Sequence, residues 1–303
     1  MIAKLPRQVI EEMAQRSQRL HHWFFHEIRN NWNFYDDTTK DKLEEIGWKP
    51  PHPAIKEDPS SSTGWSPIYD NYSGEDFLYM HREMIKNVNE TLNQIHDPNY
   101  PKIEGWLHIP PPGDPDYPVS PPLIGIKSDE SFTTRFLPWE NQFTDPNYLA
   151  GVDLSMLGAD IEFSIHNAMH GRWATVPAMG VRPGAQDDPL HPELISTQWD
   201  NPEYDYLGDT YSSHVNPIFW KLHGWIDDRI NDWKKAHGIT GEIQWKGTWV
   251  GNTHGHEHPM MMLKELSLSR KEQDDNLSNV LKIITGKGKI KGFPVIGTFA
   301  EKH

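Results

Sequence analysis

Two pairs of histidines lie four residues apart within largely apolar stretches of the sequence. His22 and His26 belong to LHHWFFHEIRN, and His166 and His170 belong to IHNAMHGRW. Residues four apart in a helix project from the same face, so each pair would present two imidazoles to one point. Such a pair can hold a metal ion once a third ligand arrives from a neighbouring element.

One further histidine follows each pair in a segment with helical periodicity. His81 lies in EDFLYMHREM and His223 lies in NPIFWKLHGWIDD, and either could supply a third nitrogen. The chain has no cysteine, so a metal here must be held by His, Asp or Glu. A single histidine in an apolar helix is more often a hydrogen-bonded core residue than a ligand, but this arrangement occurs twice. The spacing therefore predicts two metal ions.

Four segments with the apolar periodicity of helices carry these six histidines. They cover residues 6–32, 75–95, 156–174 and 216–238, and we expect the third to be interrupted at Gly171. Ligands that face inward from the helices of a bundle converge in its core. We therefore expect a mainly α-helical fold in which a four-helix bundle holds a dinuclear metal site, with nearby aromatic residues forming a dry wall around it.

Long segments rich in proline and glycine join the expected helices. Residues 49–74 and 177–212 are typical of loops, and the proline density of residues 99–147 predicts an irregular segment that wraps over the surface. We divide the chain into a catalytic domain at 1–238 and a small α+β C-terminal extension at 239–303 that packs on it.

The extension combines several short patterns. Residues 242–250 predict a strand and residues 260–268 predict a helix. Between them, the tract HGHEHP could load a metal or cover the site, although short tracts of this kind often bind metals weakly. Its histidines are His254, His256 and His258. We expect a surface or lid role for this tract.

The formal net charge of −14 argues against negatively charged partners. Nucleic acids and anionic membranes bind clustered Lys and Arg, whereas this chain has 43 acidic and 29 basic residues. The sequence contains neither an apolar run of about 18 residues, which a membrane span needs, nor the apolar segment of a signal peptide. We therefore expect a cytoplasmic protein whose partner is a small molecule, with no nucleic acid and no membrane.

The histidine motifs resemble those of type-3 copper proteins. LHHWFFHEIRN followed by SGEDFLYMHREM is similar to the first copper site of arthropod hemocyanins and prophenoloxidases. IHNAMH followed by NPIFWKLHGWIDDRI is similar to their second site, which tyrosinases share, although Asn216 stands where Asp is usual. The resemblance covers residues 15–95 and 155–235. It implies two copper ions, one bound by His22, His26 and His81 and the other by His166, His170 and His223.

The resemblance also implies an activity. We expect a dicopper oxidase or monooxygenase that uses O2 to oxidise small phenols, aminophenols or catechols, in the manner of tyrosinase or catechol oxidase. Natural-product biosynthesis is a setting that would suit this activity. A hemocyanin-like zinc enzyme that catalyses a non-oxidative rearrangement or elimination is the main alternative, because zinc also accepts three histidines and an open position. An O2-binding protein is the weaker alternative.

Two polar residues beside the second motif resemble residues that assist catalysis in that family. Glu162 stands one helical turn before His166, and Asn167 follows that histidine directly. In tyrosinases a Glu and an Asn at similar spacing hold a water that is proposed to accept the phenolic proton. Glu162 is therefore our candidate base, and the alternative is a solvated charge on the helix face or a charge at the N-terminus of the helix.

Asp227 lies one turn beyond His223. It resembles a family Asp that orients a ligand or joins the neighbouring helix, a common requirement around metal-binding histidines. The alternative is a plain salt bridge with Arg82 or Arg229.

Three more histidines lie near the motifs. His21 is adjacent to a ligand but is expected to point about 100° away from it on the helix. His52 lies in a proline-rich loop and is expected to face solvent, and His214 is a reserve ligand.

Overall fold

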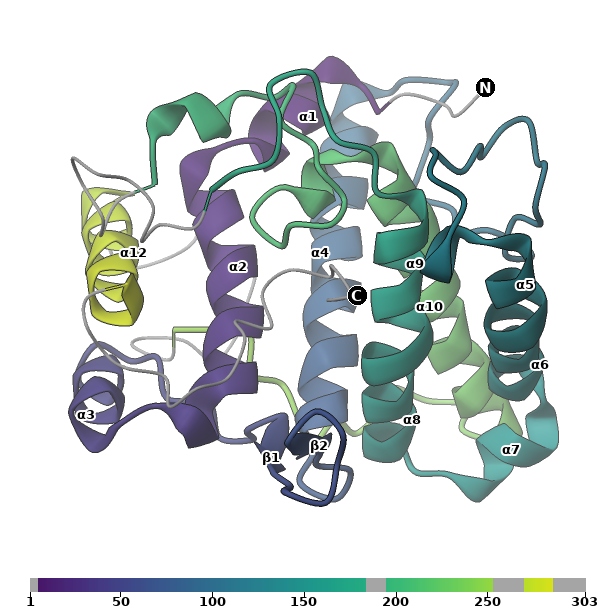
Figure 1. The fold of residues 1–303 in the computed structure, drawn as a ribbon, viewed down its shortest axis with the longest axis horizontal. Coiled ribbons are helices and arrows are strands. Elements are labelled where there is room, and N and C mark those ends of the chain that lie inside the picture. Colours follow the sequence, from purple (N-terminus) through teal and green to yellow (C-terminus); the bar gives the residue numbers. More distant parts are fainter. Residues whose placement is uncertain (1–4, 184–194, 253–269, 286–303) are drawn as a thin grey trace.

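The fold is mainly helical (Figure 1). The computed structural model describes residues 5–183, 195–252 and 270–285. All six candidate histidines lie on helical segments. These are α2 (Arg16–Asn31), α4 (Ser73–Ile95), α8 (Leu154–Ile161) with the π-helical turn η4 (Glu162–His166) and α9 (Asn167–Trp173), and α10 (Pro217–Ala236).

Helix α4 contacts most of the other histidine-bearing helices. It packs against α8 and α10, and α10 also contacts α8 and α9 (Figure 1). The backbones of α4 and α8 touch at Gly74 and Gly158, where a β-carbon added to Gly158 would stand 2.8 Å from the Cα of Gly74. Helix α4 also approaches α2, because the ring of Phe77 on α4 lies 6.3 Å from the ring of His26 on α2.

The N-terminal helix is interrupted where we predicted a continuous one. A separate helix, α1 (Arg7–Met13), precedes α2. The carbonyls at the break accept side-chain donors, Arg19 Nε bonding to Ala14 O at 3.0 Å and His214 Nε2 to Met13 O at 3.0 Å. These side-chain hydrogen bonds take the place of helical ones, so the prediction of a single helix was wrong.

Residues between α2 and α4 are more ordered than a loop. They form η1 (Trp32–Phe34), α3 (Asp37–Glu45) and a two-stranded antiparallel hairpin of β1 (Ile55–Glu57) and β2 (Trp65–Pro67). Asp36 caps the start of α3, because its carboxylate accepts from the backbone N–H of Thr39 in the first turn at 2.7 Å.

The segment predicted to be irregular up to residue 147 contains helices in its second half. The 3-10 turn η2 (Gly125–Lys127) leads into α5 (Asp129–Ser131), the π-helical turn η3 (Phe132–Phe136), α6 (Leu137–Thr144) and α7 (Pro146–Gly151). The wider turn η3 ends two residues before Pro138, whose ring would clash with the preceding turn of a regular α-helix. Proline density alone therefore predicted too much loop here.

The third histidine-bearing helix continues through Gly171 as far as Trp173, so the predicted interruption was wrong. Its irregularity lies earlier, in η4. Helix α10 begins as predicted, because the side-chain oxygen of Asn216 accepts from Ile218 N at 2.9 Å and caps it.

Residues 242–250 do not form the predicted strand. Their backbone N–H groups bond to the first turn of α4 instead, where Lys246 N donates to Glu75 at 2.6 Å and Trp249 N donates to Asp76 at 2.8 Å. These carboxylates take the donors that a neighbouring strand would need, and they join the start of the extension to the histidine-bearing core.

The last described helix is α12 (Arg270–Thr285), which contacts α2 and α3 (Figure 1). The predicted helix at 260–268 and the HGHEHP tract lie outside the described residues. None of the described helices has both the length and the apolar character needed to cross a membrane.

Candidate metal centre

The predicted histidines converge in the interior. The ligand atoms of His22, His26 and His81 lie within 4.8 Å of one another, which is the first predicted set. The same limit also groups His81 with His166 and His223, and all of these side chains are at most 2% exposed. Helices α2, α4, η4 and α10 thus place nitrogen ligands at one buried point, and these groups could hold a metal ion.

The 4.8 Å limit leaves His170 out of the second group, although its ring lies close to the rings of that group. Its ring centroid lies 4.6 Å from that of His166 and 5.4 Å from that of His223, and the side chain is fully buried. In the second group His81 takes the position that the sequence assigned to His170. The structure therefore brings all six histidines into one cluster, in which His81 is close to both predicted sets.

Hydrogen bonds fix which ring nitrogen of these histidines carries the proton. The Nδ1 atoms of His22, His81, His170 and His223 lie 2.6–2.9 Å from the backbone carbonyls of Thr210, Phe77, Leu207 and Phe219 respectively. A carbonyl can only accept, so each Nδ1 must donate. In a neutral imidazole this leaves the lone pair on Nε2, the atom available to a metal.

Three of these Nε2 atoms have no hydrogen-bond partner among the described residues, although all are buried. They belong to His22, His81 and His223. A buried nitrogen acceptor without a partner costs about 1–3 kcal/mol, and a metal ion would satisfy it. The cluster therefore fits a bound cation by its donor chemistry as well as by its spacing.

The environment keeps the imidazoles uncharged. Burial lowers the pKa of His22 to about 4 and that of His170 to about 3. For His26, His166 and His223, burial and then the neighbouring imidazoles lower the pKa well below 6.5. Neutral imidazole is the form that binds a metal, so at neutral pH protons do not compete for these nitrogens.

Aromatic rings surround the cluster, but only some of the expected ones line it. Phe25 lies 5.1 Å from the ring of His26, as the sequence suggested, whereas Phe24 packs on Trp48. Phe219 stacks on His223 at 3.7 Å, and Phe77 lies 4.6 Å from His81 and 4.9 Å from His166. Phe77 and Phe219 stand four residues before a histidine, so helical spacing could have identified both.

Glu162 is buried and forms an ion pair with Arg29 of α2 through Oε1. The same oxygen lies 3.8 Å from Nδ1 of His26, a histidine of the first set. Burial raises the pKa of Glu162, while Arg29 opposes this shift. The alternative of a solvated helix charge is therefore wrong, and Oε2 has no hydrogen-bond partner among the described residues.

Of the other two candidate residues, only Asn167 has a hydrogen bond to a histidine of the cluster among the described residues. Oδ1 of Asn167 is 3.1 Å from Nδ1 of His166, so Asn167 can hold that ring in place. Asp227 instead pairs with Arg82 Nε at 2.6 Å, which links α10 to α4.

The three additional histidines have different surroundings. His21 faces Trp48 at 5.8 Å, pointing away from the cluster as expected. His52 does not simply face solvent, because its Nδ1 lies 2.8 Å from the carboxylate of Asp76. His214 is buried 4.8 Å from the ring of His22, and its Nε2 is engaged by the Met13 carbonyl.

Sequence reasoning missed the segment that contacts two of the candidate histidines from outside the helices. Leu207 and Thr210 both lie in a region predicted to be a loop, and their backbone carbonyls receive the protons of His170 and His22. Every residue carries a carbonyl, so no side-chain pattern marks this role.

No protein-family model matches this sequence, and no curated protein matches it significantly. The case for a particular family therefore depends on the motifs and on the histidine cluster itself.

Proposed function

We propose that this protein is a type-3 dicopper enzyme that oxidises small phenols, aminophenols or catechols with O2. In this proposal α2, α4, α8–α9 and α10 form a bundle around the two ions. One ion is bound by His22, His26 and His81, and the other by His166, His170 and His223. The observation that carries the proposal is the burial of six imidazoles in one cluster that already contains two overlapping three-nitrogen groups.

The donor set favours copper over harder ions. Imidazole nitrogens suit copper and zinc, whereas Mg2+, Ca2+ and Mn2+ prefer oxygen ligands. The carboxylate of Glu162, 3.8 Å from His26, is engaged by Arg29. When bound, a pair of copper ions would supply the redox chemistry that couples reduction of O2 to oxidation of a phenol or catechol.

The residues of the chain would contribute orientation and proton transfer. The backbone carbonyls of Phe77 and Phe219 accept from Nδ1 of His81 and His223. This contact orients each ring and leaves its Nε2 available to a metal ion. Glu162 could accept a phenolic proton at Oε2 while Oε1 keeps its bond to Arg29. Its raised pKa makes it a stronger base than an exposed carboxylate.

Metal analysis of the purified protein tests the proposal most directly. We expect two copper ions per chain after reconstitution, and O2 uptake with catechol. His166→Ala should leave at most one ion and abolish this uptake. His108→Ala is the matched control, because the side chain of His108 is 81% exposed and contacts Glu140 outside the cluster. Fewer than two ions in the wild-type protein would contradict the dicopper proposal.

A zinc enzyme is the second candidate, because neutral imidazoles with available Nε2 atoms fit zinc equally well. Zinc would act as a Lewis acid in a rearrangement or elimination that consumes no O2. Copper-loaded and zinc-loaded protein should therefore be compared for turnover with and without O2. Turnover of a phenolic substrate by the zinc form in the absence of O2 would favour this candidate.

A further inference from the structure

One short segment contacts a histidine of each proposed metal set. Leu207 O accepts from Nδ1 of His170 at 2.8 Å, and Thr210 O accepts from Nδ1 of His22 at 2.6 Å. The two acceptors are three residues apart, whereas the two histidines come from α9 and α2. The position of residues 207–210 therefore determines the ring orientation of one candidate ligand on each side of the cluster.

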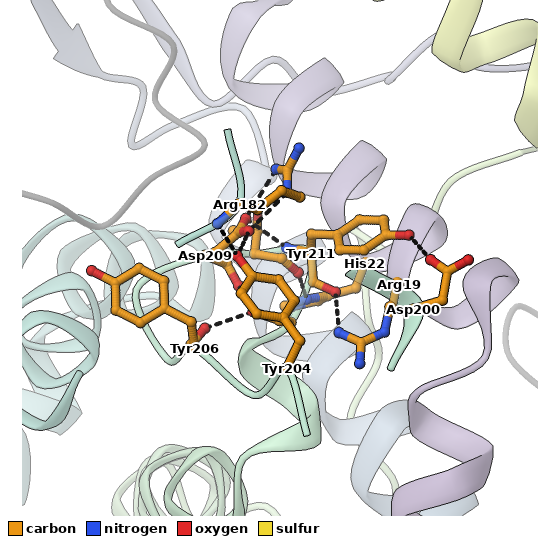
Figure 2. Close-up of polar contacts among 10 residues, drawn as sticks. Arg19, His22, Arg182, Asp200, Tyr204, Tyr206, Asp209 and Tyr211 are labelled. Atoms are coloured by element: carbon orange, nitrogen blue, oxygen red, sulfur yellow. Dashed lines mark hydrogen bonds and ion pairs between the residues drawn. The ribbon is translucent and has the colours of Figure 1, made fainter. Parts of the chain in front are cut away.

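Asp209 lies between these two carbonyls and is 2% exposed. Its carboxylate accepts from Arg182 Nε at 2.9 Å and Nη2 at 3.1 Å, and from the Tyr204 hydroxyl at 2.7 Å (Figure 2). It also accepts from the backbone N–H of Tyr211 at 3.1 Å. Two of these donors lie in the same segment and Arg182 lies outside it, so the carboxylate both fixes the segment and joins it to Arg182.

Arg182 connects this segment to α2. Its guanidinium lies over the rings of Trp23 and Tyr211, 5.0 Å from each centroid. Trp23 directly follows His22 on α2. The side chains of Arg182 and Asp209 are 7% and 3% exposed, so this is a buried ion pair whose removal on one side would leave an uncompensated charge.

We propose that Asp209, held by Arg182, is a positioning residue that sets the orientation of His22 and His170 together through the carbonyls of Thr210 and Leu207. The proposal rests on metal binding by the cluster, as proposed above. Partners that orient metal-binding histidines typically change metal affinity about 10–100-fold when they are removed. Because this pair acts on both sides of the cluster, its loss should weaken both ions rather than one.

Asp209→Asn is the principal test, measured by titration of the metal-free protein with Zn2+ against a competing chelator. We expect a loss of about 10-fold or more in Zn2+ affinity, in the range found for such partners. Glu140→Gln is the matched control, because Glu140 is also a buried carboxylate that holds a loop, accepting from Ile109 N at 2.9 Å. This control should keep the wild-type affinity.

A second readout does not require any metal. Histidine ring 15N–1H NMR spectra of the metal-free protein report which nitrogen carries the proton. Asp209→Asn should shift the Nδ1–H signals of His22 and His170, and should leave those of His81 and His223, which donate within their own helices, in place. This readout separates the positioning role from the identity of the metal, so it stands even if the dicopper proposal fails.

Milder variants keep the test decisive if Asp209→Asn does not fold. Tyr204→Phe removes one hydrogen bond to Asp209, and Arg182→Lys removes the two-pronged contact but keeps the charge. Both should shift the same two histidine signals by smaller amounts. Unchanged histidine signals and unchanged Zn2+ affinity in the folded variants would overturn the proposal, and a loss of thermal stability alone would not support it.

Discussion

Gly158 of α8 lies directly against Gly74 of α4, with no side chain between the two backbones. His81 and His166 each follow one of these glycines on the same helix by about two turns, and their ring centroids lie 5.8 Å apart. The closeness of the two backbones thus limits how far apart the two histidines can stand.

We expect Gly158→Ala to force α4 and α8 apart. The new methyl would overlap the backbone at Gly74, and overpacking of this kind costs about 1–3 kcal/mol of unfolding free energy. Urea unfolding would measure the loss, and Zn2+ affinity should fall in parallel. Gly151→Ala is the control, because an added β-carbon there meets no atom within 4 Å. Equal stability of the two variants would contradict this account.

The histidine cluster could be predicted because its information lies in local spacing. Residues four apart share a helical face, so His22 with His26, and His166 with His170, were predicted to act as pairs, and the structure places each pair in the cluster. The position of His81 close to both sets could not be predicted. It depends on the crossing of α4 with α8, which is set by backbone contact rather than by a pattern of side chains.

The remaining errors arose where side chains took the place of backbone hydrogen-bonding partners. The break before α2 depends on donors from Arg19 and His214, the second of which is about 200 residues away in sequence. The predicted strand after α10 was lost because Glu75 and Asp76 accept its N–H groups. Local periodicity records neither kind of partner.

The metal-free protein should lose stability as the pH falls below 6.5. A buried histidine whose folded pKa is lowered stays neutral while the unfolded chain binds a proton, so its contribution is present above pH 6.5 and is lost as the pH falls toward the folded value. For His22 that interval runs from 6.5 to about 4. Each such histidine can contribute a slope of up to about 1.4 kcal/mol per pH unit.

The slope of unfolding free energy against pH also includes buried carboxyls, and those with a raised pKa change stability in the opposite direction to the histidines. Comparing the slope of the wild-type protein with that of a histidine variant isolates the contribution of that histidine. Burial raises the pKa of Glu27 to about 7, for example, and this carboxyl is present in every variant. The pKa of His223 is lowered well below 6.5, so His223→Phe should make unfolding free energy depend less steeply on pH between 6.5 and 5. Urea unfolding at several pH values measures this, and an unchanged slope would contradict the neutral, buried state of His223.

Glu162→Gln should affect both catalysis and stability. If Glu162 is the base as proposed, its loss should reduce hydroxylation of a monophenol by about 10²–10⁴-fold while catechol oxidation continues, because catechol needs no oxygenation. The variant also leaves Arg29 buried without its anion, which costs about 3–5 kcal/mol. Oxygen uptake with each substrate and urea unfolding measure the two effects.

The double variant Arg29→Met with Glu162→Gln separates these roles. Removing both charges should restore much of the stability, since an apolar replacement of a buried ion pair is often neutral. Hydroxylation should stay low if Glu162 is the base. Recovery of hydroxylation together with stability would show that Glu162 acts only through its pairing with Arg29.

Asp227→Asn distinguishes an orienting role from a link between helices. Asp227 and Arg82 are 23% and 24% exposed, and a partly solvated pair of this kind contributes at most about 1 kcal/mol. Because Asp227 pairs with Arg82 rather than with a ring nitrogen, we expect a small loss of unfolding free energy and an unchanged Zn2+ affinity. Arg82 also donates to Asn231 Oδ1 at 2.9 Å, so Arg82→Gln should lose more, and a double variant no less stable than Arg82→Gln alone would confirm the link. A fall in Zn2+ affinity of about 10-fold, as for residues that orient a ligand, would show instead that Asp227 acts on the metal centre.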